Sequence, residues 1–231
     1  MAGTKPQPKF RRAPPAIRRE SLIEATLQCL REHGHEGVSV RRISAAAGVS
    51  VGLINHHFPG KASLVAAAYE SLSGSLLSSI HQHALGAGDE PRARLRQFFI
   101  AWFAPDKIDP QLFQVWLVFW SMVAHSAEMR LVHARTNATY RETLEALLVE
   151  LRGLPSVPAF NVQLAATGLS ALLDGLWIEA SLRGGAFNAG EAIALCDDWV
   201  TALCAGGFAN LRAGASVAAR DPASPTPEHS P

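Results

Sequence analysis

The stretch at residues 39–58, SVRRISAAAGVSVGLINHHF, constrains the fold of this chain more than any other part of its sequence. A run of three alanines lets two helices approach closely, and Gly48 can adopt a backbone conformation that a β-carbon opposes. Ser39 and Ser50 each stand where a helix-capping residue is favoured. The pattern therefore predicts two short helices joined by a tight turn, which is a helix-turn-helix.

The spacing of apolar residues predicts helices in the rest of the chain as well. In the first helix Gly34 is the expected stop, and in the second Ile43, Ala46 and Ala47 are expected to face inward. We find no alternating strand pattern and no internal repeat, so the predicted fold class is all-α with about nine helices. The predicted helices cover 15–33, 40–47, 51–58, 61–85, 90–104, 110–126, 128–152, 160–183 and 188–209.

The composition of the chain divides it into four parts. Residues 1–14 are rich in Pro, Lys and Arg, and residues 210–231 contain the run PASPTPEHSP, so both ends are predicted to be disordered. Between them we expect an N-terminal domain of three helices, with the helix-turn-helix, over 15–61. A larger helical domain is expected over 62–209.

Charge is distributed unevenly between these parts, although the whole chain has a net charge of only +1. Residues 1–61 hold ten Lys and Arg against four acidic residues, a net charge of +6, and the remainder has a net charge of −5. This asymmetry favours an N-terminal module that binds a polyanion. A basic N-terminus that is merely a solvated tail is the alternative.

Several classes of protein are disfavoured by the sequence. The three cysteines lie in apolar helical patterns and are expected to be reduced, buried thiols. The N-terminus lacks the apolar segment of a secretory signal, and the most apolar stretch, 164–182, contains two acidic residues, which favours a buried helix over a membrane span. We therefore expect a cytoplasmic protein without a membrane partner. No nucleophile–base arrangement, phosphate-binding loop or metal-ligand cluster is found, so no enzymatic activity, cofactor or metal is predicted.

The second helix of the motif has two different sides. Ile54 and Phe58 belong, with Ile43 and Val49, to an apolar set that holds the two helices together. An ordinary turn between helices is one interpretation of this pattern. Polar side chains that have no role in a core favour instead a helix that lies in the major groove of DNA. These polar side chains are Ser50, Asn55, His56, His57 and, close by, Lys61.

The sequence over 22–68 resembles the DNA-binding domain of TetR-type repressors. The resemblance rests on the AGVS turn, on a first helix that ends at His33 and Gly34, and on the His-Phe-x-x-Lys ending that starts at His57. Over about 17–205 the chain is also similar to the BetI branch, through IRRESLIEATL, GLINHHF, VWLVFWSMVAHS, LVHARTNATYRETLEALLVELR and GLSALLDGLWIEASL.

BetI-type repressors respond to choline and control glycine-betaine synthesis. The resemblance therefore implies a transcriptional repressor of choline uptake and glycine-betaine synthesis genes that choline relieves. The segment ALLDGLW also occurs outside the choline branch, so a TetR-type repressor of unrelated genes that responds to another small metabolite is an alternative. A helical enzyme or scaffold with an accidental turn motif is a third interpretation.

The resemblance implies that the motif binds double-stranded operator DNA. Asn55 can pair with a base edge, and Lys61 begins the next helix, where its charge can meet a phosphate. Two positions depart from the family pattern, because His56 stands where Tyr is usual and Arg42 where an acid often completes a capping box. For His57 a packing role is equally open. The expected DNA-binding residues are Arg41, Arg42, Ser50, Val51, Gly52, Leu53, Asn55, His56, His57 and Lys61, beside a flexible basic arm of Lys9, Arg11, Arg12, Arg18 and Arg19.

The resemblance also implies that the larger domain binds a small-molecule inducer and forms a homodimer. Small residues favour close packing of the helices near 160–183 and 188–209, which are the expected two-fold interface. Choline carries a quaternary ammonium group, which aromatic faces and a carboxylate can bind. Core packing of the aromatic residues, and a tie between helices through Asp174, are the alternatives. The candidate ligand-binding residues are Trp102, Trp116, Phe119, Trp120, Tyr140, Asp174 and Trp177.

Overall fold

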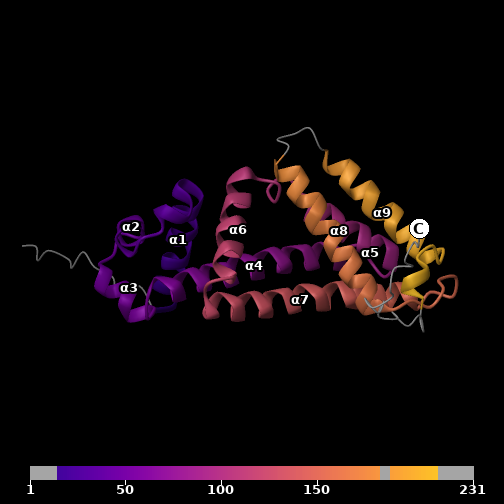
Figure 1. The fold of residues 1–231 in the computed structure, drawn as a ribbon, viewed down its shortest axis with the longest axis horizontal. Coiled ribbons are helices and arrows are strands. Elements are labelled where there is room, and N and C mark those ends of the chain that lie inside the picture. Colours follow the sequence, from indigo (N-terminus) through magenta and orange to yellow (C-terminus); the bar gives the residue numbers. More distant parts are fainter. Residues whose placement is uncertain (1–14, 183–187, 213–231) are drawn as a thin grey trace, which may run out of the picture.

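The computed structural model describes residues 15–182 and 188–212, and within these ranges the chain is helical almost throughout (Figure 1). The prediction of an all-α fold is confirmed. The predicted disordered segments, 1–14 and most of 210–231, lie outside the described residues. The helices are α1 (Pro15–Gly37), α2 (Val40–Ala46), α3 (Val51–His57), α4 (Lys61–Leu85), α5 (Pro91–Trp102), α6 (Pro110–Val123), α7 (Ala127–Arg152), α8 (Val162–Leu182), α9 (Ala189–Cys204) and a short 3-10 helix, η1 (Ala209–Leu211).

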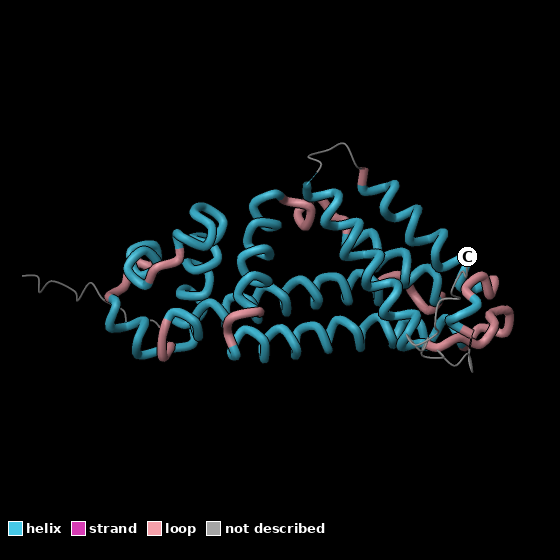
Figure 2. The backbone as a smooth tube through the Cα atoms, viewed as in Figure 1, coloured by secondary structure: helices cyan, strands magenta, loops and turns pink. Residues whose placement is uncertain are grey.

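The helices form a small head and a larger body that share one long helix. α1, α2 and α3 gather at one end of the molecule, and α4 runs from this head into the body (Figure 1). In the body α4 and α7 pack side by side, and α5 packs against both; α8 and α9 pack together, α8 on α7 and α9 on α5 (Figure 2). α6 stands between the two parts, because it contacts α1 of the head as well as α7 and α8 of the body.

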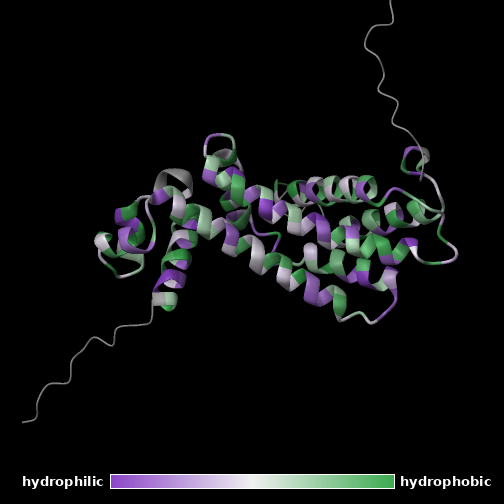
Figure 3. Ribbon diagram, turned by 90° about the horizontal axis from the view of Figure 1, so that it is seen from below, coloured by the Kyte–Doolittle hydropathy of each residue, from purple (hydrophilic) through white to green (hydrophobic). Residues whose placement is uncertain are grey.

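The core of the body is rich in aromatic residues. Hydrophobic and hydrophilic residues alternate along most helices, as expected for helices that each bury one side (Figure 3). The largest fully buried side chains belong to α5, its C-cap and α6, and they are Phe98, Phe99, Phe103 and Phe119.

Glycine determines where α1 breaks. Gly34 has φ 60° and ψ −155°, which is non-helical, although a last turn continues to Gly37. The predicted stop at Gly34 therefore marks the kink, and the helical hydrogen bonding extends beyond the predicted end at residue 33.

Three predicted details of the helices are wrong. Ala46 is exposed, and Ser44 is buried in its place because its hydroxyl donates to the carbonyl of Arg41 at 2.8 Å, which leaves no unpaired group. The last helix ends at Cys204 and not at 209, because Gly206 takes φ 72°. Residues 210–212, predicted to be disordered, continue from η1 to a bridge with Phe160.

The turn of the helix-turn-helix depends on Gly48, which has φ 63°. A β-carbon there would meet no atom within 4 Å, so its effect would come from backbone strain alone. We expect Gly48→Ala to lower the free energy of unfolding by about 1 kcal/mol. Gly52 lies in the helix α3 without a positive φ, so Gly52→Ala is the matched control and should be neutral or stabilising by about 0.5 kcal/mol. Urea unfolding at one protein concentration measures both, and equal effects of the two substitutions would contradict this role of Gly48.

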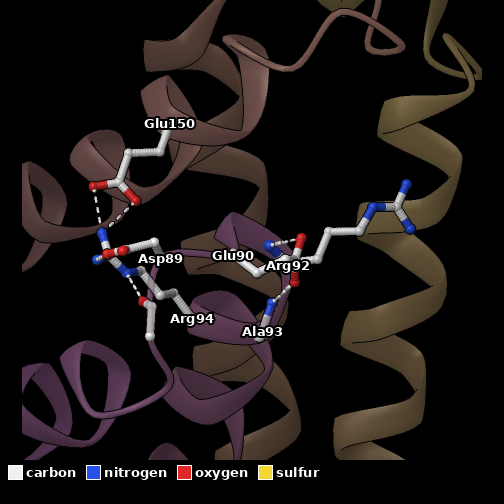
Figure 4. Close-up of polar contacts among 7 residues, drawn as sticks. Asp89, Glu90, Arg92, Ala93, Arg94 and Glu150 are labelled. Atoms are coloured by element: carbon white, nitrogen blue, oxygen red, sulfur yellow. Dashed lines mark hydrogen bonds and ion pairs between the residues drawn. The ribbon is translucent and has the colours of Figure 1, made fainter.

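Arg94 ties the start of α5 to the end of α7. Its guanidinium contacts both carboxylate oxygens of Glu150, at 2.9 and 3.0 Å, and Asp89 at 3.0 Å, and its Nε donates to the carbonyl of Gly88 at 2.6 Å (Figure 4). The Arg94 side chain is only 17% exposed, but Asp89 is fully exposed and Glu150 is 41% exposed, so solvent screens these ion pairs and the network positions the helices more than it stabilises them. Next to it, the carboxylate of Glu90 caps α5 (Figure 4). The network fixes two helices that enclose the cavity described below.

Three further observations concern the described part of the chain as a whole. None of its helices combines the length and hydrophobicity that a membrane crossing requires. Within the same residues, no group of three or more His, Cys, Asp or Glu side chains is placed so that it could hold a metal ion. The three cysteines are buried free thiols.

Candidate functional site

α3 is capped by the residue before it and held to the head by two apolar side chains. The Ser50 side chain accepts a hydrogen bond from the backbone N–H of Leu53 at 3.3 Å and so caps the helix. Ile54 is fully buried, and Phe58, directly after the helix, is 2% exposed. The opposite side of α3 therefore faces solvent.

The side chains expected to contact DNA lie mostly on this solvent side. The rings of His56 and His57 meet edge to face with their centroids 5.3 Å apart, so His57 packs against its neighbour. The exposed members of the set are Ser50, Val51, Gly52, Asn55 and His56, whereas Leu53 and His57 are half-buried.

The same surface is electropositive. Arg41 and Arg42 are exposed in the first turn of α2, whose cap Ser39 accepts a hydrogen bond from the backbone N–H of Arg42 at 3.2 Å. Lys61 is half-buried and begins α4. The first turns of α2, α3 and α4 contain no acidic residue, so no carboxylate there opposes an approaching polyanion.

Part of the predicted flexible basic arm belongs instead to a helix. Arg18 and Arg19 lie in α1, and the guanidinium carbon of Arg19 lies 5.1 Å from the centre of the Phe58 ring. This cation–π contact connects the start of α1 to the residue that follows α3. The three other arm residues, at positions 9, 11 and 12, lie outside the described residues.

A cavity of about 130 Å³ lies in the body between α4, α5, α6, α7 and α8. Its size is close to that of an engineered cavity of about 150 Å³ that holds benzene, so it suits a small metabolite. Of the seven predicted ligand residues Phe119 does not line it: this ring is fully buried and stacks on Tyr69 at 4.8 Å. The other six do line it: Trp102, Trp116, Trp120, Tyr140, Asp174 and Trp177.

Aromatic rings from five helices, α4 to α8, line the cavity. Trp120 meets Trp177 edge to face at 6.1 Å and Trp116 at 6.2 Å with tilted planes. Trp102 stacks on Tyr140 at 4.9 Å with an interplanar angle of 18°. The rings are therefore held at different angles to one another, and aromatic faces are the groups that attract a bound cation.

One acidic residue, Asp174 on α8, belongs to this wall. Burial raises the pKa of Asp174 to about 6, and a hydrogen bond from Ser170, whose Oγ is 3.4 Å away, lowers it again in part. At pH 7 the carboxylate is therefore mostly ionised. No Lys or Arg in the described ranges forms an ion pair with it, since the one cationic side chain at the cavity, Lys107, contacts Asp106 at 2.6 Å.

Sequence reasoning missed the part of the wall that α4 and α7 supply. The hydroxyl of Tyr69 on α4 lies 2.7 Å from Nδ1 of His133 on α7, which joins the two helices at the cavity. Tyr69 was hard to recognise, because its helical spacing is also that of an ordinary core residue. The missed residues are Tyr69, Ser73, Leu76, Leu77, Lys107, Leu112, His133, Thr136 and Asn137.

Comparisons with known proteins match both parts of this arrangement. The profile of the bacterial regulatory proteins of the tetR family matches residues 22–68, and that of the BetI-type transcriptional repressor C-terminal domain matches 91–205. The HTH-type transcriptional regulator BetI of Burkholderia thailandensis is 34% identical over 190 residues, which are 82% of this chain and 94% of that protein. The chain belongs to the TetR family.

Within the TetR family its C-terminal domain is of the BetI type. A solved structure described as a transcriptional regulator from Pseudomonas aeruginosa PAO1 is 42% identical, has a TM-score of 0.81 and covers 88% of this chain and 98% of that one. Another, a regulator from Saccharomonospora viridis in complex with choline, shares the fold at 19% identity, with a TM-score of 0.70 over 80% of this chain and 96% of that one. As a TetR-family member the chain is a DNA-binding transcriptional repressor and not an enzyme.

Proposed function

We propose that this repressor controls genes of choline uptake and glycine-betaine synthesis, in the cytoplasm, and that choline in the body cavity relieves repression. The observation that carries the proposal is the cavity itself, which tryptophan and tyrosine rings line together with the carboxylate-bearing Asp174. The BetI names of the curated relatives and the choline complex of the Saccharomonospora viridis regulator support the choice of ligand.

The chemistry of the cavity matches a quaternary ammonium ion. Such an ion donates no hydrogen bond, so a protein binds it through aromatic faces, at about 0.5–2 kcal/mol each, and through negative charge. Here Trp120, Trp177 and Asp174 supply both. An anionic or fatty acyl ligand would meet the carboxylate without a matching cation.

Calorimetry on the purified protein tests the ligand. Choline and betaine aldehyde should bind, and a fatty acyl compound should not. If the fatty acyl compound binds and the two cations do not, the cavity serves a repressor of other genes with a different metabolite.

For the DNA, we assign base reading to the exposed side of α3 and phosphate binding to the residues around it. Replacing Asn55, which is exposed on α3, by Ala should relax discrimination between operator and random duplex by about 1–3 kcal/mol. Lys61→Ala should weaken binding to both duplexes alike and reduce the dependence of affinity on salt. Fluorescence anisotropy with both duplexes over a salt series measures this, and identical behaviour of the two variants would refute the assignment.

For assembly, we propose a homodimer through α8 and α9. These helices leave apolar side chains in solvent: Leu182 is 67% exposed and Leu195 is 47% exposed. The exposed Ala171 and Gly175 of α8 allow a second helix to approach closely. A two-fold axis there would place two copies of α3 against the two halves of a palindromic operator.

For the response, we propose that α4 transmits the state of the cavity to the head. Lys61 begins this helix, and Tyr69 and Ser73 of the same helix line the cavity. Choline would favour the arrangement of α4 that it contacts best, in which the two heads no longer match the operator. This requires only that choline binds the two arrangements with different affinity.

A further inference from the structure

The cavity wall contains buried polar atoms that the protein itself leaves without a partner. In the described ranges four buried side-chain nitrogen or oxygen atoms have no hydrogen-bond partner, and three of them belong to cavity residues: Ser73 Oγ, Trp102 Nε1 and the Tyr140 hydroxyl. The fourth, Ser181 Oγ, lies elsewhere. Buried polar groups are nearly always paired, so this concentration at one cavity needs an explanation.

Each unpaired aromatic residue has a paired counterpart in the same wall. The Tyr69 hydroxyl is 2.7 Å from His133 Nδ1, whereas the Tyr140 hydroxyl has no partner. Trp177 Nε1 donates to the carbonyl of Lys107 at 2.9 Å, whereas Trp102 Nε1 donates to nothing in the described protein. The rings of the two unpaired residues stack on each other, so both residues belong to one part of the wall.

The serine is less informative. A serine hydroxyl within a helix can turn to the backbone carbonyl one turn earlier. Ser73 is therefore able to find a partner without any ligand. The indole N–H of Trp102 has no such choice, because it is a donor only and its ring is fixed by the stack on Tyr140.

We propose that Trp102 and Tyr140 donate hydrogen bonds to an uncharged oxygen of the ligand, and thereby select quaternary ammonium compounds that carry a hydroxyl, ether or carbonyl oxygen. This inference rests on the proposed function, because it presupposes a cationic ligand in the cavity. The ammonium group cannot accept these hydrogen bonds, so a separate acceptor atom must do so.

The neighbourhood of Asp174 requires this oxygen to be uncharged. Tyr140 and Asp174 line the same cavity. Burial first and the charge of Asp174 next raise the pKa of Tyr140 well above its ordinary value, while the side chain of Ser170 lowers it in part. A ligand carboxylate at the same place would be repelled by Asp174. The zwitterion glycine betaine should therefore bind more weakly than choline.

Calorimetry with four ligands and the full-length protein tests the inference. The ligands are choline, its methyl ether, glycine betaine, and propyltrimethylammonium, in which a methyl group replaces the hydroxyl of choline. We expect choline and the ether to bind about tenfold more tightly than propyltrimethylammonium, the value for one or two neutral hydrogen bonds. The ether retains the acceptor and loses the donor, so it shows which of the two the protein uses.

Two pairs of matched variants locate the contact. Trp102→Phe and Tyr140→Phe should each reduce the preference for choline over propyltrimethylammonium by about threefold or more, because they remove the free donors and keep the rings. Trp177→Phe and Tyr69→Phe should leave that preference unchanged, because their polar groups already have partners.

The outcomes separate this inference from the proposed function. Equal affinity of the unsubstituted protein for choline and propyltrimethylammonium, or a preference that persists in both Trp102→Phe and Tyr140→Phe, overturns the inference and leaves the cation site standing. Failure of all four ligands to bind overturns the proposed function itself. The affinities of the unsubstituted protein for choline and propyltrimethylammonium test the inference without any variant, so the test stands even if a variant does not fold.

Discussion

Replacing Asp174 by asparagine should weaken choline binding at pH 7 by at least about 30-fold and, at the same time, make the protein more stable. The first effect follows from the loss of the buried negative charge, since removal of one partner of a buried charge pair costs about 2 kcal/mol or more. The second follows from the pKa of Asp174, which burial raises from 3.8 to about 6. A carboxylate that must ionise in such a site opposes folding at neutral pH.

Whether Asp174 stabilises or destabilises the protein at a given pH follows from the number of protons that the folded and unfolded states bind. Between pH 4 and 6 the folded protein holds the Asp174 proton more tightly than the unfolded chain, so the contribution of Asp174 to stability is highest below pH 4 and declines as the pH rises to about 6. Above pH 6 the loss is complete, and a shift of about two units corresponds to about 3 kcal/mol. We therefore expect Asp174→Asn to gain about 2 kcal/mol at pH 7 and nothing at pH 4.

Urea unfolding at the two pH values and calorimetry with choline measure both effects. Glu142→Gln, which removes an exposed carboxylate from α7, is the control and should change neither. In the unsubstituted protein the affinity for choline should also fall as the pH drops below about 6, because the neutral acid does not attract the cation. An Asp174→Asn variant that binds choline as well as the parent would rule out a direct role for this carboxylate.

Ile54→Ala should strongly weaken specific DNA binding and leave the cavity intact. Ile54 is fully buried on α3, and such a truncation costs about 2–5 kcal/mol. A helix of seven residues has little stability of its own, so it depends on this packing. We expect faster hydrogen exchange confined to the head and a loss of operator affinity of at least about tenfold, with choline binding unchanged.

Val51→Ala is the matched control for this prediction. Val51 lies on the same helix but is 39% exposed, so its truncation should change stability by no more than about 0.5 kcal/mol. If Ile54→Ala lowers the free energy of unfolding no more than Val51→Ala does, α3 is positioned by something other than its buried side.

The local features of the head were predictable from the sequence because each has a local physical cause. Ser39 and Ser50 cap the helices that follow them, and Gly48 takes the left-handed conformation that the turn requires. Ala46 was wrongly predicted to face inward, because alanine is compatible with both the buried and the exposed side of a helix. The burial of Ser44 was not predicted, because it depends on a hydrogen bond that its hydroxyl donates to the carbonyl of Arg41.

The cavity was predictable only in part, because it is a property of how helices cross. Aromatic content indicated Trp102, Trp116 and Trp120 correctly as wall residues, but Phe119 has the same helical pattern and lies behind the wall. The α4 contribution could not be found, because nothing in the sequence states which side of that helix faces α7. The hydrogen bond between Tyr69 and His133 spans 64 positions and depends on that crossing alone.

The continuity of α4 has a consequence for engineering. Because this helix begins at Lys61 and already lines the cavity at Tyr69, the orientation of the head is set by the number of residues between them. One inserted residue would turn the head by about 100° about the helix axis, whereas an insertion of about seven would nearly restore its direction. A sensor chimera that joins the head of one repressor to the body of another must therefore keep the number of residues between these two positions. Operator affinity across a series of such insertions would show how far the head can be rotated before it no longer binds the operator.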